Sequence, residues 1–299
     1  MSTPGQKSLT EPPENLKEAI DWVLRVSGLA SGPIIYMHYF IDALEAFVRN
    51  SPIGSTAFLE NLCVEIKKDE GQKPTGPFKQ LAESLQRFIG YGHKRGGSVG
   101  WGITGEGIVK MGEMKTVYTP AYDGSWFTDV YSNDPNDVKK KSCVQNFFTA
   151  IEKIYEGLTE LYWKCKKEWK NDNLGGNTEL NQFMKKNGFT KTQLNTSMTG
   201  DKIANNALRD LKEFTTAYND AGDNPSLEAF RSQLEQNAST DPSKSPLSAL
   251  YILSTYAYVH SSSPATSSFA GYSGLTALAG GAYGFNLGGL GTVMSALLA

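Results

Sequence analysis

Apolar residues recur every three or four positions along most of residues 14–259, which is the spacing of one face of an α-helix. The pattern predicts helices over residues 14–27, 34–48, 58–66, 78–89, 142–170, 177–187, 199–218, 227–234 and 247–259. We therefore expect a mainly α protein, an irregular multi-helix domain with long glycine-rich and aromatic loops and no large sheet.

Capping signals mark several ends of these helices. Ser55 and the pair Ser245-Pro246 stand where an N-cap, or an N-cap followed by a first-turn proline, begins a helix. Gly90 and Gly188 stand where a glycine ends one. These signals support the helix limits that the apolar spacing gives.

Two stretches break the helical pattern. Gly90–Gly107 contains eight glycines and predicts a flexible loop. Met114–Tyr131 is rich in Tyr, Thr and Trp and predicts a hairpin or a loop anchored by its aromatic residues. The first stretch includes a G-x-G-x-x-G sequence at Gly100–Gly105. Because no strand pattern precedes it, a loop is favoured over a dinucleotide site.

Charge changes the picture at one boundary. The 299 residues carry 29 basic and 31 acidic side chains, and this net charge of −2 gives no reason to expect a nucleic-acid partner. Lys244 is the last charged residue of the sequence. We therefore divide the chain into a flexible N-terminal tail (1–12), a helical region (13–244) whose main loop covers about 90–132, and an uncharged helix followed by a glycine-rich tail (245–299).

The uncharged segment contains one feature typical of membrane helices. Gly280, Gly284 and Gly288 have the G-x-x-x-G spacing that lets helices approach closely within a bilayer. A helix over Leu275–Ala299 would be ~37 Å long, enough to cross a hydrocarbon core of ~30 Å. Because the stretch is rich in glycine and lacks flanking Lys or Arg, a segment packed on the protein or left flexible is favoured over insertion.

The three cysteines, Cys63, Cys143 and Cys165, are too few for a disulfide framework and lack the paired spacing of a zinc site. On one continuous helix, Cys143 and Cys165 would be ~33 Å apart, which excludes a disulfide between them. Two alternatives stay open within the chain: Cys63 pairs with one of the other two, or all three are buried thiols. We slightly favour the second alternative, in which all three cysteines are buried thiols.

No short motif indicates catalysis. The three histidines stand apart, and no nucleophile elbow accompanies them, so we expect no enzyme activity, no cofactor and no bound metal. Lysines concentrate at 139–141 and 164–170 among tryptophans, which fits a solvated helix end better than an anion site. Asn195 and Asn237 begin glycosylation sequons, which matter only in a secretory route.

Four blocks of sequence carry a family resemblance: residues 13–28 (PENLKEAIDWVLRVSG), 81–91 (LAESLQRFIGY), 157–165 (GLTELYWKC) and 203–211 (IANNALRDL). In this order, they are similar to blocks of the variant erythrocyte surface antigens of Babesia parasites. The stretch 90–132 falls where members of that family differ most.

The resemblance implies a protein exported to the surface of the infected erythrocyte, where such antigens are exchanged to evade antibodies and are associated with cytoadhesion. It implies contact with a host-cell surface protein or an antibody, and with a second family subunit, and it supplies no catalytic residues. Residues 13–244 would then be ectodomain-like, with 90–132 as the variable loop. Members of the family resemble this chain in lacking an obvious signal peptide.

The chain also departs from the family pattern. Family members are longer, richer in cysteine and lysine, and end in a transmembrane helix with a short cytoplasmic tail. The alternative function is therefore a soluble helical interaction protein, intracellular in the parasite cytosol or exported, from a short or truncated family member. Membrane association stays open between the two.

Overall fold

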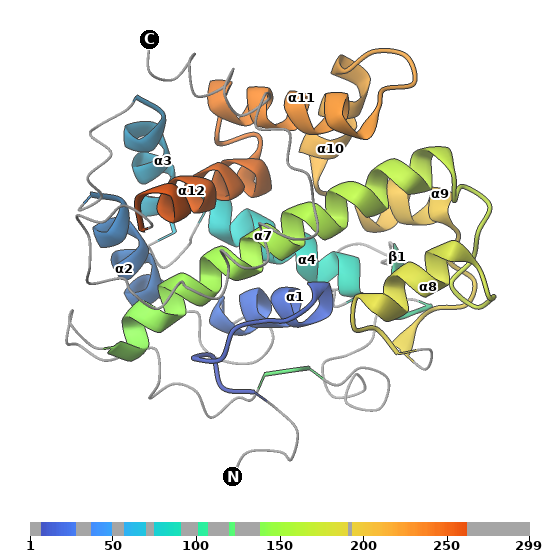
Figure 1. Ribbon diagram of the computed structural model, residues 1–299, viewed down its shortest axis with the longest axis horizontal. Helices are drawn as coiled ribbons and strands as arrows, with labels where there is room; N and C mark the ends of the chain where they lie inside the picture. The colour runs from blue at the N-terminus through green and yellow to red at the C-terminus, as the bar shows by residue number, and fades with distance from the viewer. Residues whose placement is uncertain are drawn as a thin grey trace.

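The computed structural model describes residues 7–27, 37–49, 57–69, 75–90, 101–106, 120–122, 138–190 and 193–261. Its longest helix, α7 (Val138–Lys167), crosses the molecule in Figure 1. Both α1 (Leu16–Val26) and α12 (Pro246–Ser261) pack along α7, and α4 (Pro77–Ile89) packs against α1 and α12. The buried apolar residues of these four helices belong to one continuous core.

The first helix, α1, is buried on nearly every side. Asn15 caps it, because its side chain accepts a hydrogen bond from the Glu18 amide at 3.0 Å. Trp22 lies at the centre of the core, with its ring edge-on to Phe40 at 6.0 Å. A helix buried all round must pair its charges, and the Lys17 ammonium lies 2.8 Å from the Asp21 carboxylate.

The other helices flank this centre in Figure 1. On one side lie α2 (Met37–Arg49) and α3 (Ala57–Lys67), and on the other lie α8 (Glu179–Lys186), the short α9 (Gly200–Lys202) and the π-helical turn η3 (Ile203–Ala207). Along a third edge, α10 (Lys212–Asp220) and α11 (Leu227–Thr240) form a helical hairpin. Its Phe214 and Phe230 rings pack on Tyr162 of α7 at 5.3 and 5.7 Å.

The prediction of a mainly α protein is confirmed. Gly90 ends α4 with φ 108°, and Gly188 follows α8 with φ 90°, the left-handed conformation that glycine adopts readily. The side chains of Thr178 and Ser226 cap α8 and α11. In these places, local sequence signals set the ends of the helices.

The predicted single helix over 199–218 is wrong. The chain forms α9 and η3, leaves the helical conformation at Leu208, and resumes as α10 after Leu211. Both leucines are buried, so the break directs two apolar side chains into the core and lets α10 run beside α11. Within the break, the Asp210 carboxylate pairs with Arg87 of α4 at 2.9 Å.

Residues 7–12 belong to the folded body rather than to a flexible tail. Leu9 is fully buried. Its carbonyl accepts hydrogen bonds from the Trp22 indole N–H at 3.0 Å and from the Asn146 amide at 2.9 Å. These bonds hold the segment against α1 and α7.

Part of the predicted flexible glycine loop is a tight hairpin. Within it, β1 (Trp101–Gly102) pairs antiparallel with β2 (Gly105–Glu106), and the Ile103 side chain at the turn is fully buried. The Ile103 amide donates a hydrogen bond to the Phe88 carbonyl at 2.9 Å. The G-x-G-x-x-G sequence therefore uses its amides at the C-terminus of α4, where they satisfy the last carbonyls of that helix.

The charge-free segment begins inside the core. Leu247, Leu250 and Leu253 of α12 are almost completely buried among α4, α7 and α11. Every side chain of residues 246–255 is buried or half-buried, which leaves this part of α12 little exposed surface for charged residues. Gly280, Gly284 and Gly288 lie outside the described residues. None of the described helices combines the length and the apolarity needed to cross a membrane.

Candidate functional site

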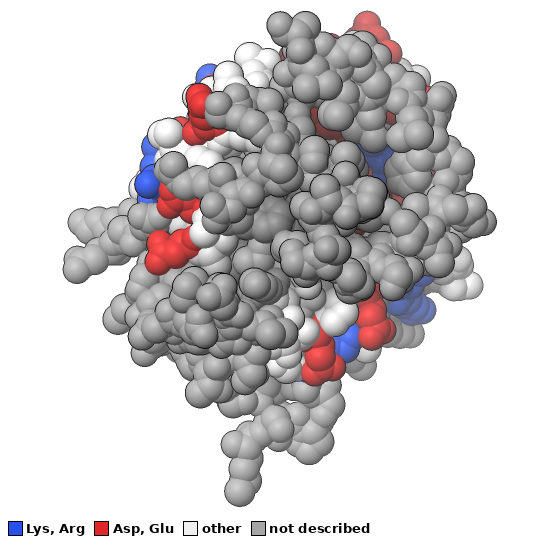
Figure 2. All heavy atoms as spheres, turned by 60° about the vertical axis from the view of Figure 1, so that its left-hand side comes forward, with Lys and Arg blue, Asp and Glu red and all other residues white. Residues whose placement is uncertain are grey.

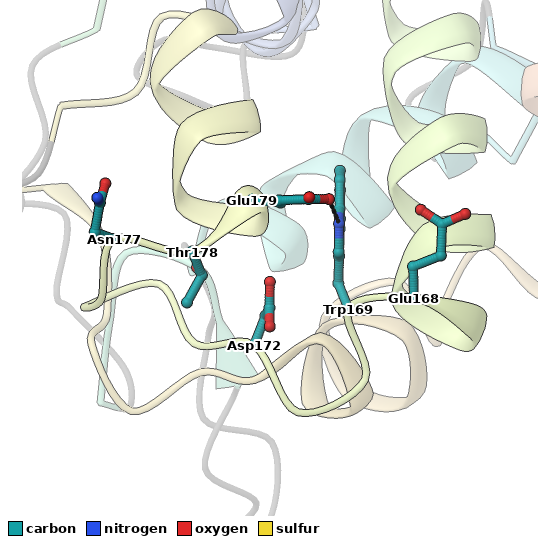
Figure 3. A pocket seen from close by; sticks show the side chains of 6 residues that line it. All are labelled: Glu168, Trp169, Asp172, Asn177, Thr178 and Glu179. Carbon is teal, nitrogen blue, oxygen red and sulfur yellow. Dashed lines mark hydrogen bonds between the residues drawn. The ribbon is translucent and has the colours of Figure 1, made fainter.

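An open pocket of about 580 Å³ lies where α7 ends and α8 begins (Figure 3). It is lined by Glu168, Trp169, Asp172, Asn177, Thr178 and Glu179. The connecting loop is folded by Asn173, whose side-chain oxygen accepts hydrogen bonds from the Gly175 and Gly176 amides at 3.0 and 2.7 Å. This turn brings the start of α8 back toward the end of α7.

The pocket is acidic, and its one aromatic side chain, Trp169, already has partners within the chain. The Trp169 indole N–H donates to the Glu179 carboxylate at 3.0 Å, the dashed line in Figure 3. The Lys164 ammonium lies 4.7 Å from the centre of the Trp169 ring, a cation–π contact. Three carboxylates thus line the pocket with no histidine or cysteine beside them. Within the described ranges, no group of three His, Cys, Asp or Glu is arranged to hold a metal ion.

The lysine-rich end of α7 is engaged within the chain. The Lys166 ammonium donates to the Asn205 side chain of η3 at 2.7 Å. The Lys167 ammonium donates to the Asn224 carbonyl at 3.1 Å and lies 4.9 Å from the Trp163 ring. These contacts hold the end of α7 against its neighbours.

On the face shown in Figure 2, acidic and basic side chains of the described residues lie near one another, without a broad area of one sign.

All three cysteines are buried thiols. Cys143 and Cys165 lie near opposite ends of the continuous α7, as the helical spacing predicts, and Cys63 lies on α3. Burial raises the pKa of the Cys165 thiol well above its ordinary value. Because the thiolate is the reactive form, we expect this thiol to react slowly in the folded protein.

Both glycosylation sequons lie in folded elements. Asn195 is buried, and its side-chain oxygen accepts hydrogen bonds from the Ser197 amide and hydroxyl at 3.0 and 2.8 Å. Asn237 lies within α11 and donates to the Asp220 carboxylate at 3.2 Å. Because the Asn195 side-chain nitrogen is buried, this fold has no room for a glycan at that position.

A second arrangement, which we call the α1 clamp, was not foreseen from the sequence. Asp21 and Arg25 of α1 hold the segment 120–122 against the helix. The Asp21 carboxylate accepts a hydrogen bond from the Ala121 amide at 2.8 Å, and the Arg25 guanidinium donates to the Tyr122 carbonyl at 3.0 Å. The Ala121 carbonyl in turn accepts from the Lys7 amide at 2.8 Å. The segment contributes main-chain atoms to these bonds. Its Tyr122 side chain is also fully buried, and the hydroxyl donates to the Glu11 carbonyl at 3.3 Å.

A sequence signal for the clamp does exist. Lys17, Asp21 and Arg25 are spaced four residues apart, so they share one side of α1. All three are buried although they carry charge. Charged residues in a row on a helix with this little exposed surface indicate a polar partner inside the fold, because buried charges require one.

Comparison with protein-family models, with curated proteins and with solved structures yields no match.

Proposed function

We propose that this chain is a variant surface antigen of infected erythrocytes, exported to the cell surface, where it acts by protein–protein contact in antigenic variation and cytoadhesion, without catalysis. The observation that carries the proposal is the way the folded body holds the stretch 90–132. The α1 clamp holds it at Ala121 and Tyr122, and the end of α4 holds it at Ile103, in each case through main-chain hydrogen bonds. The buried side chains of Ile103 and Tyr122 add to this attachment.

Main-chain anchoring suits a stretch whose sequence is exchanged. Every residue except proline offers the same N–H and C=O groups, so these hydrogen bonds survive most changes of side chain. The charged groups that make the clamp, Asp21 and Arg25, belong to block 13–28, which carries the family resemblance. The constant part of such an antigen would thus supply the charged side chains of the clamp, and the variable stretch would supply main-chain groups together with the buried side chains of Ile103 and Tyr122.

Contacts between the resembling blocks also support the proposal. Gly157 leaves space for Leu16, because a Cβ added at Gly157 would lie 3.0 Å from that side chain. Arg87 pairs with Asp210 at 2.9 Å. Block 13–28 therefore meets block 157–165, and block 81–91 meets block 203–211, as expected if the resemblance follows a common scaffold.

The proposed partners are a host-cell surface protein or an antibody, together with a second family subunit. The alternative, a soluble intracellular or exported helical interaction protein, would use the same scaffold without display on the cell.

Antibody labelling of infected erythrocytes tests the proposal. Antibodies raised against the folded full chain are applied to intact cells and to permeabilised cells, and an antibody to a parasite cytosolic protein serves as the control for membrane integrity. We expect labelling of intact cells, and its loss after trypsin treatment of the intact cell surface. Labelling only after permeabilisation would contradict surface display and favour the alternative.

A further inference from the structure

A short N-terminal segment contacts the two residues that the α1 clamp holds. The Lys7 amide donates a hydrogen bond to the Ala121 carbonyl at 2.8 Å, in a parallel bridge between Lys7 and Tyr122. Four residues further along, the Glu11 carbonyl accepts a hydrogen bond from the Tyr122 hydroxyl at 3.3 Å. We call this segment, residues 7–11, the strap, because both of its ends contact the same short piece of chain.

The strap is itself fixed to the helical body. Leu9, at its middle, is fully buried, and the Leu9 carbonyl accepts hydrogen bonds from side chains of α1 and α7. At the first residue of the strap, the Lys7 ammonium lies 2.8 Å from a carboxylate oxygen of Glu14 and of Glu18. With its middle and its first residue fixed in this way, the strap can hold the segment 120–122 together with α1.

The strap and α1 divide the polar groups of Ala121 and Tyr122 between them. Asp21 and Arg25 of α1 bind the Ala121 N–H and the Tyr122 carbonyl. The strap binds the Ala121 carbonyl and the Tyr122 hydroxyl. Groups in one hydrogen-bond network are coupled, so the loss of the bonds to the strap also weakens the bonds to α1. Because the Tyr122 side chain is completely buried, a protein that contacts it must first displace this segment.

We propose that the strap is a lock that keeps Tyr122 as a hidden epitope. While the strap is bound, Tyr122 is out of reach of antibodies, and release of the strap frees the segment 120–122 and exposes it. This inference rests on the proposed function, in which antibodies are a partner of the stretch 90–132. In that setting, the lock withdraws an attachment point of the stretch from antibody recognition.

Amide hydrogen exchange of the full chain tests the lock at the Ala121 N–H, which is bonded to Asp21 rather than to the strap. Lys7→Pro removes the amide that binds the Ala121 carbonyl, so we expect exchange at Ala121 to accelerate on the order of tenfold. Lys7→Met is the matched control, because it removes the ammonium and keeps the amide. Partly exposed ion pairs contribute little, and we expect at most about a twofold change. Exchange of the Phe230 amide of α11, bonded to the Ser226 carbonyl at 3.0 Å, serves as the reference.

Tyr122→Phe tests the other end of the strap, because it removes the hydroxyl that donates to Glu11 and keeps the aromatic ring. We expect exchange at Ala121 to accelerate about threefold, with exchange at Phe230 unchanged. Equal exchange at Ala121 in the wild type, Lys7→Pro and Tyr122→Phe would overturn the lock, since α1 alone would then hold the segment.

Antibody binding to the purified full chain tests the hidden epitope directly. Antibodies are raised against a peptide of residues 117–125, and one is chosen whose binding to the peptide is lost on Tyr122→Ala. The apparent affinity of this antibody is reduced by the fraction of molecules in which the segment is free, so it should bind the wild-type chain on the order of a hundredfold more weakly than the peptide. It should bind Lys7→Pro on the order of tenfold more tightly than the wild type, in step with the exchange at Ala121.

Equal affinity of this antibody for the peptide and for the wild-type chain would refute the hidden epitope. Because these measurements use purified protein, their failure is distinguishable from a failure of the proposed function, which the labelling of intact cells tests separately.

Discussion

Gly102 lies against Gly90 where the hairpin meets the C-terminus of α4. A Cβ added at Gly102 would lie 2.1 Å from the Gly90 Cα and 2.3 Å from the Gly90 nitrogen. Both neighbours are main-chain atoms, so no side-chain rotation relieves the clash. We expect Gly102→Ala to lower the free energy of unfolding by about 3 kcal/mol, measured by urea unfolding, because the hairpin must move away from the helix.

Gly222 provides the control for this substitution. It has φ 92° and nothing within 4 Å of an added Cβ, so Gly222→Ala introduces backbone strain without a clash. That strain costs roughly 1–2 kcal/mol. If Gly102→Ala lowers the free energy of unfolding by no more than Gly222→Ala does, the hairpin does not lie as close to α4 as described.

At the scale of elements, the α1 clamp predicts a local effect of Arg25→Met. The substitution keeps a long, unbranched side chain, although one shorter than that of arginine, and removes the donor to the Tyr122 carbonyl. We expect the free energy of unfolding to fall by about 2 kcal/mol, as for other hydrogen bonds from charged groups. Amide exchange at Ala121 and Tyr122 should accelerate more than exchange in α1.

Arg87→Met is the matched control for the clamp, because the Arg87 side chain is half exposed and its ion pair with Asp210 lies near the surface. Surface pairs contribute about 0–1 kcal/mol. Unchanged exchange at Ala121 in Arg25→Met, with a loss of stability no larger than in Arg87→Met, would show that Arg25 does not hold the segment.

Most helices were predictable from the sequence because their signals are local. The periodic apolar face of α7 and the glycine at position 90 act within a turn or two of the chain. The break at Leu208–Leu211 was not predictable, because it depends on contacts with α4 and α11. The buried placement of Leu9 likewise depends on Trp22 and on the distant Asn146.

The sites were less predictable than the helices, for the same reason. The carboxylates of the α7–α8 pocket come together only when the loop after Trp169 folds back. The capping of α12 by Glu213 joins two segments that show no common pattern in the sequence. By contrast, the impossibility of a disulfide between Cys143 and Cys165 required only the length of one helix.

At the scale of the whole molecule, the compositional boundary after Lys244 is not a boundary of the core. Apolar residues from Leu9 to Leu253 form one cluster, which joins the first and the last described helices. The core therefore spans nearly all of the described ranges, and we expect these parts to unfold together.

The three cysteines can measure that cooperativity, because they report on separate parts of the core. Cys63 lies on α3, and the other two lie near the ends of α7, ~33 Å apart along the helix. In the native protein, we expect almost no reaction with iodoacetamide, since all three thiols are buried. With increasing urea, alkylation of each cysteine, followed by peptide mass spectrometry, should rise with the same midpoint as the loss of helical circular dichroism. Alkylation of Cys63 at a lower urea concentration than Cys143 and Cys165 would show that α3 unfolds separately, and the single cooperative core would be refuted.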